Sequence, residues 1–568
     1  MPPVLASIAR NPSAIALGDR RNVGLGLVIA LHLSAAAILI WSEVDPLPQF
    51  AFILAWGLFN FVCLLVLPRP IVAAALSLIL VIVLVLLSQL KYQALFMTVS
   101  FVDLMIIDLN TISFLFAIYP VLILIVALIA PGVLLLLGMF WWIDMLRIRR
   151  RMSLAGCTAC IAGLGGIGFW QPLEPSESFY GGNFLSSFAR SGVDAISEFM
   201  VHGFMESDAV VSDRLKSMDE ATCAPTEKPP HIIVVHDESS FDIRMVPGIK
   251  VPDGYGAHFR SYDGRARRFL VEGAGGPSWY TEFSVFAGLS ARSFGRFAYF
   301  VTRIAAGRVK RGLPNALRRC GYRTYSLYPW LGAFMGARDF QTSVGVQRFS
   351  DIAALGTRDL EPDAFFYDAA SKIIGRERAK GPLFIFTYLA ANHFPWNFRY
   401  RPNLMPGWHD LGNAPNVDEY LRRQAMSAGD YSNFVAALKR DYPDESFLIV
   451  RFGDHQPDFA ADIIEPGLSP SQIAQRLLAY DLRYLTTYYA IDTINFTPAD
   501  LSSALEKLDA PYLPLLVQEA AGLPLDPSFA EQKRILQRCG GLFYACSGGA
   551  EARRFNRLLI DAGLIHGL

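Results

Sequence analysis

The N-terminal 170 residues hold five long apolar stretches joined by short polar segments. A helix that crosses a membrane needs about 20 consecutive apolar residues. The mean hydropathy of +0.31 and the 52% hydrophobic content are also too high for an ordinary soluble enzyme of this length. The sequence therefore predicts membrane-spanning helices, which we place at 23–41, 49–67, 71–90, 114–143 and 152–170.

Two parts of this region depart from a simple span. The fourth stretch, 114–143, is longer than a bilayer requires and contains Pro131, which favours a tilted or kinked helix. The segment 92–110 is interrupted by Asp103 and Asp108, so we expect an interfacial helix there and not a sixth span.

The charges between the spans indicate the orientation of the chain. Cytoplasmic loops of membrane proteins collect Lys and Arg. With five spans, the basic joints fall on one side and the acidic joints, with Glu43, Asp45, Asp103 and Asp108, on the other. The sequence therefore predicts that everything after residue 170 lies outside the cytoplasm. The basic residues are Arg10, Arg20, Arg21, Arg69, Arg147, Arg149, Arg150 and Arg151.

The seven cysteines divide between these two parts of the chain. Those at 63, 157 and 160 lie in predicted spans, where cysteine packs as a small apolar residue. Cys223, Cys320, Cys539 and Cys546 lie in the exported part, where one or two disulfides can form. We predict a disulfide between Cys539 and Cys546. A metal site made of these four is less favoured, because none has close paired spacing with histidine.

The exported part divides into a connector and an α/β domain. We expect a membrane domain at 1–170, a connector containing an amphipathic helix at 171–230, and a catalytic domain at 231–568. Short apolar runs at 231–236, 323–328, 382–389 and 446–452 alternate with helical segments. This alternation predicts a mostly parallel sheet that is covered by helices on both faces.

Polar side chains follow three of these predicted strands at the points where they end. Glu238 follows the first strand, His393 the third, and Asp454 and His455 the fourth. Taken singly, each has an ordinary explanation as a helix-cap neighbour, a turn or a surface residue. Ligands of parallel sheets bind beyond the carboxyl ends of the strands, so the residues together favour a site for a divalent cation such as Mn²⁺ or Zn²⁺.

A candidate nucleophile lies in the segment 271–295. A Gly-rich turn there leads to Ser278 and then to a helical pattern. The N-H groups and the dipole at a helix start stabilise an anion, which suits an activated hydroxyl. The alternative is an ordinary serine N-cap, with Glu282 near the capping-box position.

The order of these residues behind five spans resembles the lipoteichoic acid synthase and phosphoglycerol transferase group of the alkaline phosphatase and sulfatase superfamily. The resemblance implies a three-layer α/β domain and one divalent metal, Mn²⁺ before Zn²⁺ or Mg²⁺. It assigns that metal to Glu238, Ser278, Asp454 and His455. The family nucleophile is usually a threonine four residues before a glutamate, and the matching residue is Ser278; Thr281 is the fallback.

The resemblance also implies residues that bind the substrate. His393 matches the histidine that contacts the transferred phosphate, and we expect Trp396 of the same segment, AANHFPW, to bind substrate as well. Arg338, in FMGARDF, matches an arginine that binds the head group. The chain departs from the family at Gly336, where an aromatic residue is usual, and near 328–330, where a histidine is expected.

The implied activity is transfer of glycerophosphate from phosphatidylglycerol to a glycan or lipid-linked glycan through a covalent phospho-serine. The expected place is the bacterial inner membrane, with the catalytic domain on the periplasmic side. The formal charge of zero gives no indication of a nucleic-acid partner. Other readings are a phosphoethanolamine transferase, a phosphodiester hydrolase or a catalytically silent binding module. A true sulfatase fits poorly, because Ser278 lacks the following Pro and Arg of the sulfatase motif.

Overall fold

The computed structural model describes residues 12–95, 97–171, 173, 181–211, 214–215, 223 and 228–568. The chain forms two compact units, Met1–Val201 and His202–Leu568. The boundary falls inside the segment 171–230 that we expect to be a connector. Arg10 and much of that segment lie outside the described residues.

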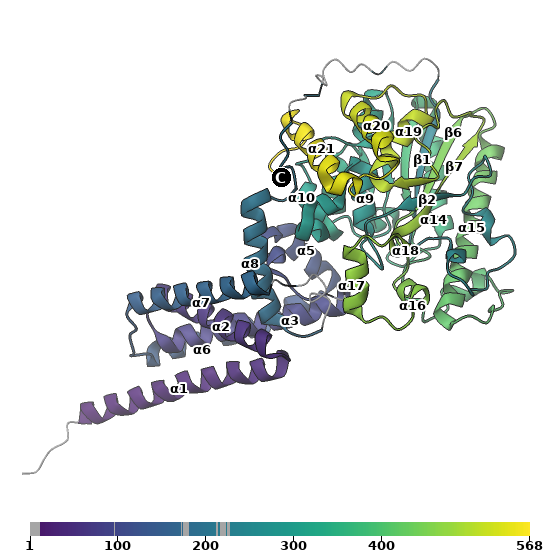
Figure 1. The fold of residues 1–568 in the computed structure, drawn as a ribbon. Coiled ribbons are helices and arrows are strands. Elements are labelled where there is room, and N and C mark those ends of the chain that lie inside the picture. Colours follow the sequence, from purple (N-terminus) through teal and green to yellow (C-terminus); the bar gives the residue numbers. More distant parts are fainter. Residues whose placement is uncertain are drawn as a thin grey trace, which may run out of the picture. The chain divides into compact units, whose positions relative to one another are not determined.

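The first unit is helical (Figure 1). Among its described residues, five helices are long and apolar enough to cross a membrane, which confirms the five predicted spans. They are α1 (Pro12–Ser42), α2 (Pro46–Val66), α3 (Pro70–Leu95), α6 (Val121–Ile143) and α7 (Arg150–Trp170). The unit also contains α4 (Phe101–Ile106), α5 (Leu109–Ile118) and most of α8 (Phe184–His202).

Two boundaries in this unit differ from the prediction. The stretch 114–143 is divided between α5 and α6 at Pro120, whose ring removes a backbone donor. The segment 92–110 is not one helix, because Ser100 and Asp103 form a capping box at the start of α4, and Asp108 caps α5. Asp108, for example, accepts a hydrogen bond from the backbone N-H of Thr111 at 2.8 Å. These acids therefore start helices, as short polar side chains often do.

The second unit is built on an eight-stranded sheet of order β4-β3-β5-β1-β6-β7-β2-β8 (Figure 1). The central strand β1 pairs in parallel with β5 and β6. Of the described strands, β7 alone runs against its neighbours, so the predicted mostly parallel sheet is confirmed. The strands are β1 (His231–Asp237), β2 (Arg267–Leu270), β3 (Arg323–Leu327), β4 (Arg348–Ser350), β5 (Leu383–Tyr388), β6 (Phe447–Gly453), β7 (Thr486–Ile494) and β8 (Lys507–Asp509).

Helices cover both faces of this sheet. The longer ones are α9 (Ser278–Ala287), α14 (Asp363–Glu377), α15 (Pro415–Asp441), α17 (Pro470–Leu478), α19 (Leu513–Ala520), α20 (Pro527–Cys539) and α21 (Ala550–Asp561). The shorter ones are α10 (Val301–Ala305), α11 (Leu313–Arg319), α12 (Ala337–Ser343), α13 (Ile352–Leu355), α16 (Ala460–Ile464) and α18 (Leu482–Leu485). Disulfides join Cys223 with Cys320 and Cys539 with Cys546.

The two faces of β1 pack against different helices. Ile233 and Val235 lie in one core cluster with side chains of α14 and α15, such as Phe366 and Phe434. On the other face, Phe386 of β5 packs against Phe286 of α9, with ring centroids 4.6 Å apart. Because strand side chains alternate, odd-numbered positions of β1 face α14 and α15, and even-numbered positions face α9. This alternation places Asp237 and Glu238, the two acids at the end of the strand, on opposite faces.

Candidate functional site

Four residues predicted from the sequence converge beyond the carboxyl ends of the central strands. Glu238 follows β1, Ser278 begins α9, and Asp454 and His455 follow β6. The Ser278 Oγ lies 3.3 Å from Glu238 Oε2 and 3.2 Å from His455 Nε2. The same His455 nitrogen lies 3.4 Å from Glu238 Oε1 and 3.5 Å from Asp454 Oδ2. All four residues are buried and form one polar cluster.

The backbone after β1 is bent to form this cluster. Ser239 has a φ of 49°, in the left-handed region that residues other than glycine rarely adopt. Hydrogen bonds hold it there: its N-H donates to Asp454 Oδ1 at 2.8 Å, and its hydroxyl donates to Glu238 Oε1 at 2.7 Å. An unfavourable conformation maintained by its surroundings is common at functional sites.

The Gly-rich turn before α9 places the candidate nucleophile. Gly275 and Gly276 have φ values of 70° and 157°, which glycine adopts with little strain. The turn leads into Ser278 at the first position of the helix, where its hydroxyl faces Glu238 and His455. Thr281, the fallback, donates its hydroxyl to the backbone oxygen of Asp454 at 2.6 Å. The geometry therefore favours Ser278 over Thr281 as the reactive hydroxyl.

Opposite charges control ionisation in the cluster. Burial raises the pKa of Glu238, but the hydrogen bond from His455 and the charges of His393, His455 and His236 lower that pKa well below its ordinary value. Burial lowers the pKa of His455, but the charges of Asp454 and Glu238 raise it to about 9. Glu238 thus remains a carboxylate, and the site attracts positive charge.

The donor atoms of this site fit a metal ion. Ligand atoms of His236, Glu238 and Asp454 lie within 4.8 Å of one another and could hold one. The buried Asp454 Oδ2 lies 2.9 Å from His236 Nε2 and 3.5 Å from His455 Nε2. Neither of these contacts makes a well-directed hydrogen bond to that oxygen in the described part of the chain. A buried carboxylate oxygen without a well-directed hydrogen bond is costly, and a divalent cation with oxygen and imidazole ligands would satisfy it.

His236 was missed by the sequence analysis. Inside an apolar run it reads as an ordinary strand residue. The alternation of the strand was the available signal, because it places a residue two positions before Glu238 on the same face as Glu238.

His393 lies beside the cluster. It is half-buried, its ring lies 4.7 Å from that of Trp330, and it stacks on Phe394 at 4.3 Å. Its charge is among those that lower the pKa of Glu238. This position suits contact with a bound substrate, and that role remains a prediction.

The other two predicted substrate residues have partners of their own. Arg338 pairs with Asp351 at 2.5 Å and lies over the ring of Phe349. Trp396 is buried in a core cluster, where its ring packs against those of Tyr420 and Phe459. Among the described residues, neither side chain makes a hydrogen bond or ion pair with Glu238, Ser278, Asp454 or His455, so their substrate-binding roles remain predictions.

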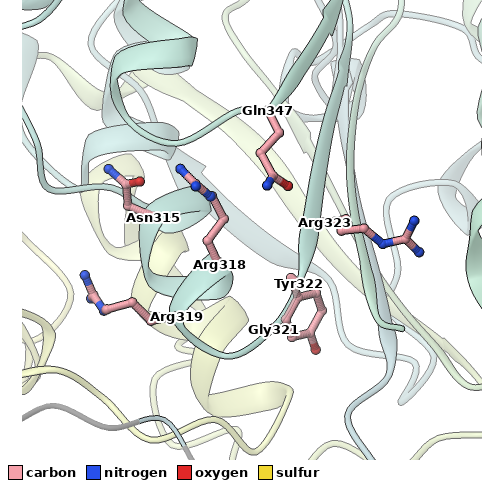
Figure 2. Close-up of a pocket in the computed structure, with 7 residues that line it drawn as sticks. All are labelled: Asn315, Arg318, Arg319, Gly321, Tyr322, Arg323 and Gln347. Atoms are coloured by element: carbon pink, nitrogen blue, oxygen red, sulfur yellow. The ribbon is translucent and has the colours of Figure 1, made fainter. Parts of the chain in front are cut away.

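A cavity of about 450 Å³ lies elsewhere (Figure 2). Gly321 and Tyr322, in its wall, directly precede β3, so the cavity lies toward the amino ends of the parallel strands. It is separate from the cluster around Ser278. Its lining is Asn315, Arg318, Arg319, Gly321, Tyr322, Arg323 and Gln347.

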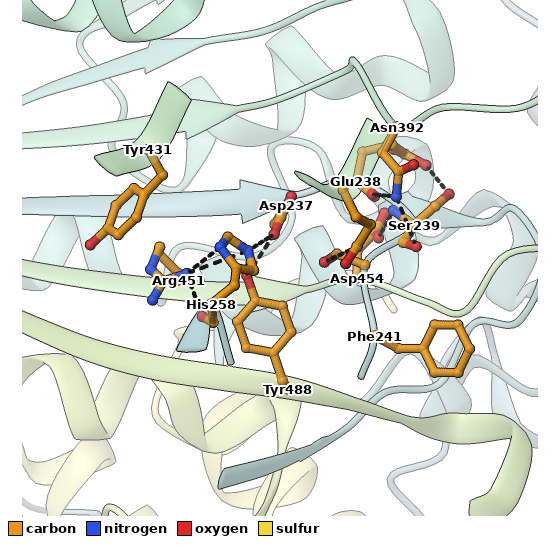
Figure 3. Close-up of polar contacts among 12 residues, drawn as sticks. Asp237, Glu238, Ser239, Phe241, His258, Asn392, Tyr431, Arg451, Asp454 and Tyr488 are labelled. Carbon is orange, nitrogen blue, oxygen red and sulfur yellow. Dashed lines mark hydrogen bonds and ion pairs between the residues drawn. The ribbon is translucent and has the colours of Figure 1, made fainter. Parts of the chain in front are cut away.

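A second polar network lies on the opposite face of β1 (Figure 3). Asp237 accepts hydrogen bonds from Tyr488 at 2.6 Å and from His258, with 3.0 Å between Asp237 Oδ2 and the His258 Nε2. Arg451 donates to the backbone oxygen of His258 at 2.9 Å and pairs with Asp492 at 3.0 Å. Asp237 ends the first predicted strand, but nothing in the local sequence reveals its partners His258 and Tyr488, which lie 21 and 251 residues away.

One protein-family model matches part of the second unit. Residues 272–483 match the sulfatase family model, a range that includes Ser278, His393, Asp454 and His455. This part of the second unit is therefore similar to the sulfatase family. Glu238 lies before the matched range.

Individual relatives are distant. The capsular polysaccharide biosynthesis protein RkpI of Rhizobium meliloti (strain 1021) is 27% identical over 241 residues, which are 41% of this chain and 42% of that protein. Streptococcus pyogenes phosphoglycerol transferase GacH shares 14% identity with a TM-score of 0.46, covering 63% of this chain and 89% of its own. Neisseria meningitidis lipooligosaccharide phosphoethanolamine transferase A shares 12% sequence identity with a TM-score of 0.43. The match covers 84% of this chain and 96% of that protein.

Proposed function

We propose that this protein is a membrane-bound phosphotransferase in which Ser278 is the nucleophile. The contact of its hydroxyl with Glu238 and His455 at the start of α9 is the observation that carries the proposal. We assign catalysis to residues 231–568 and membrane attachment to the five apolar helices, which suit a lipid donor.

The metal would be held by Glu238, Asp454, His455 and Ser278, and Mn²⁺ is the ion we propose. When bound, a divalent cation there lowers the pKa of a coordinated hydroxyl and screens the charge of a phosphodiester. Ser278 gives up its proton to solvent and attacks phosphorus, forming an Oγ–P bond. The N-H groups at the start of α9 stabilise the added negative charge.

The donor we propose is phosphatidylglycerol, and the first bond to break joins phosphorus to the diacylglycerol oxygen. His393, beside the cluster, protonates that departing oxygen, and Arg338 binds the head group if it exchanges its partner Asp351 for substrate. An acceptor hydroxyl then attacks the phospho-serine, which releases Ser278 and completes the transfer.

The proposed acceptor is a glycan or lipid-linked glycan on the periplasmic side of a bacterial inner membrane. The likeness to a protein named for capsular polysaccharide biosynthesis supports a glycan. A phosphoethanolamine donor is the second candidate, because the ligand cluster activates Ser278 in the same way for either lipid head group.

Mass analysis tests the proposal on the full-length protein in phosphatidylglycerol vesicles with Mn²⁺. We expect a glycerophosphate adduct on Ser278 that disappears on addition of a soluble glucan and is absent from Ser278→Ala. Ser284→Ala is the matched control, since Ser284 is a buried serine of the same helix. Loss of the adduct in water alone would indicate a hydrolase, and an adduct only with phosphatidylethanolamine would indicate the second donor. Full turnover by Ser278→Ala would overturn the assignment.

A further inference from the structure

Two aromatic side chains lie stacked beneath the proposed metal site. His236 of β1 and Tyr388 of β5 are register partners on adjacent parallel strands. Their rings lie 3.7 Å apart and are 8° from parallel, and both residues are buried. The rings of Phe386 and Phe452 surround the imidazole at 5.9 Å and 5.1 Å. The sheet therefore fixes this pair before any ligand binds.

Each ring directs a polar atom at a different carboxylate. The Tyr388 hydroxyl donates to Glu238 Oε2 at 2.7 Å. The Nε2 of His236 lies 2.9 Å from Asp454 Oδ2. One stacked pair thus contacts both carboxylates that would hold the cation.

The other oxygens of the Glu238 and Asp454 carboxylates are also held by neighbouring groups. Glu238 Oε1 faces His455, and Asp454 Oδ1 accepts the backbone N-H groups of Ser239 and His455, each at 2.8 Å. Glu238 Oε2 is shared, because it accepts from Tyr388 and from the hydroxyl of Ser278. Loss of the Tyr388 hydroxyl would free Glu238 to rotate and would alter the place of the nucleophile.

We propose that the His236–Tyr388 pair is a positioning device that holds Glu238 and Asp454 in the orientation required for one divalent cation. The inference rests on the metal site of the proposed function. Two carboxylates at one site repel each other until a cation is bound, so their rotamers must be held by neighbours. Groups that orient metal ligands in this way typically change metal affinity by 10–100-fold when they are removed.

The test is Mn²⁺ binding to full-length protein in detergent, measured by titration calorimetry. Tyr388→Phe keeps the ring and its stacking and removes a single oxygen, and His236→Gln removes the imidazole. We expect each variant to bind Mn²⁺ about 10–100-fold more weakly than the wild type. The pulsed electron paramagnetic resonance signal of bound Mn²⁺ should keep the same number of coupled imidazole nitrogens in both.

Matched controls exist for both changes. Tyr322→Phe removes a buried tyrosine hydroxyl that donates to the Pro230 carbonyl at 2.9 Å. His231→Gln removes a buried imidazole at the opposite end of β1, where its Nδ1 accepts from the backbone N-H of Leu383. These partners lie away from Glu238, Ser278, Asp454 and His455, so both variants should bind Mn²⁺ within twofold of the wild type.

Three outcomes distinguish failure of the positioning role from failure of the proposed metal site. Affinities of Tyr388→Phe and His236→Gln within twofold of the wild type would overturn the positioning role. Loss of one imidazole nitrogen from the Mn²⁺ signal in His236→Gln would overturn it as well, because His236 would then be a ligand. Equal binding by the wild type and Glu238→Gln would instead show that the proposed metal site is wrong. If His236→Gln fails to fold, Tyr388→Phe decides the question.

Discussion

The two faces of β1 at its carboxyl end carry polar networks of opposite character. On one face, Asp237 is satisfied by Tyr488 and His258, and Arg451 supplies a permanent positive charge (Figure 3). On the other, the buried Asp454 Oδ2 lies 2.9 Å from His236 Nε2 and makes no well-directed hydrogen bond in the described part of the chain. Asp237 and Glu238 are neighbours in the sequence, yet the first belongs to a completed network and the second to one that requires a ligand. A satisfied buried network stabilises the fold, whereas an unsatisfied one marks a functional site.

The pKa values on the two faces agree with this contrast. Burial raises the pKa of Asp237, but hydrogen bonds from His258 and Tyr488 lower it below its ordinary value. Burial and the charge of Arg451 lower the pKa of His258, which keeps that histidine neutral. His455 on the other face is charged instead, because two carboxylates face it. On the face that carries Glu238 and Asp454, the positive charge of His455 thus balances the carboxylates, and a metal ion can replace that charge.

The largest effect on turnover and Mn²⁺ affinity is expected on the face of β1 that carries Glu238 and Asp454. Asp454→Asn should lower turnover and Mn²⁺ affinity by about 10³-fold, because it removes a charged ligand at the reacting centre. The amide oxygen can still accept the two backbone N-H groups, so the free energy of unfolding of metal-free protein should change by less than about 1 kcal/mol. Calorimetry with Mn²⁺ and an assay of lipid turnover measure the first part. Turnover within tenfold of the wild type would contradict it.

The network around Asp237 should give the opposite result, a loss of stability with little change in Mn²⁺ affinity. Arg451→Met removes the buried cation and should lower the free energy of unfolding by about 3 kcal/mol, because partners of a buried charge are left unpaired. Mn²⁺ affinity of the folded variant should stay within about threefold. Urea denaturation in detergent measures the stability. Arg440→Met, which removes an exposed pair with Asp441, is the control and should leave the free energy of unfolding nearly unchanged.

Glu282 shows a third way to bury an acid. Gln341 donates to one of its oxygens at 2.8 Å, and burial raises its pKa to about 7. The folded protein therefore holds a proton there that the unfolded chain releases near its ordinary pKa of 4.5. Stability should fall as pH rises through this window and level off above it.

Glu282→Gln tests this by removing the titrating group. The stability difference between wild type and variant should change by about 3 kcal/mol between pH 4.5 and 7.5, with the wild type losing more as pH rises. Denaturation at several pH values, without metal, provides the measurement. Parallel pH profiles for the two proteins would show that Glu282 is ionised throughout.

The smallest effect is expected at the cavity near the amino ends of the strands (Figure 2). Arg318 is an exposed residue of that cavity. Arg318→Ala should leave Mn²⁺ affinity and lipid turnover within twofold of the wild type and change stability by less than about 0.5 kcal/mol. A tenfold loss of turnover would give that cavity a part in the reaction.

Prediction from the sequence succeeded where the signal was local. The apolar runs of β1, β5 and β6 mark strands, and the acids and histidines after them mark the edge where ligands bind. β2, β4 and β8 have only three or four residues, too few to show an alternating pattern. Partners such as His258 and Tyr488, which lie 230 residues apart, depend on how distant strands pair, and no local pattern reveals that.

Gly453 constrains the spacing of the backbone segments that form the site. This last residue of β6 is the register partner of Asp237, and a methyl group added to it would lie 1.7 Å from the carbonyl oxygen of Ser240. Any larger residue would wedge apart the two chain segments that carry Glu238 and Asp454. The distance between these two backbone segments is therefore set by direct contact of main-chain atoms, whereas neighbouring side chains set how the two carboxylates are turned.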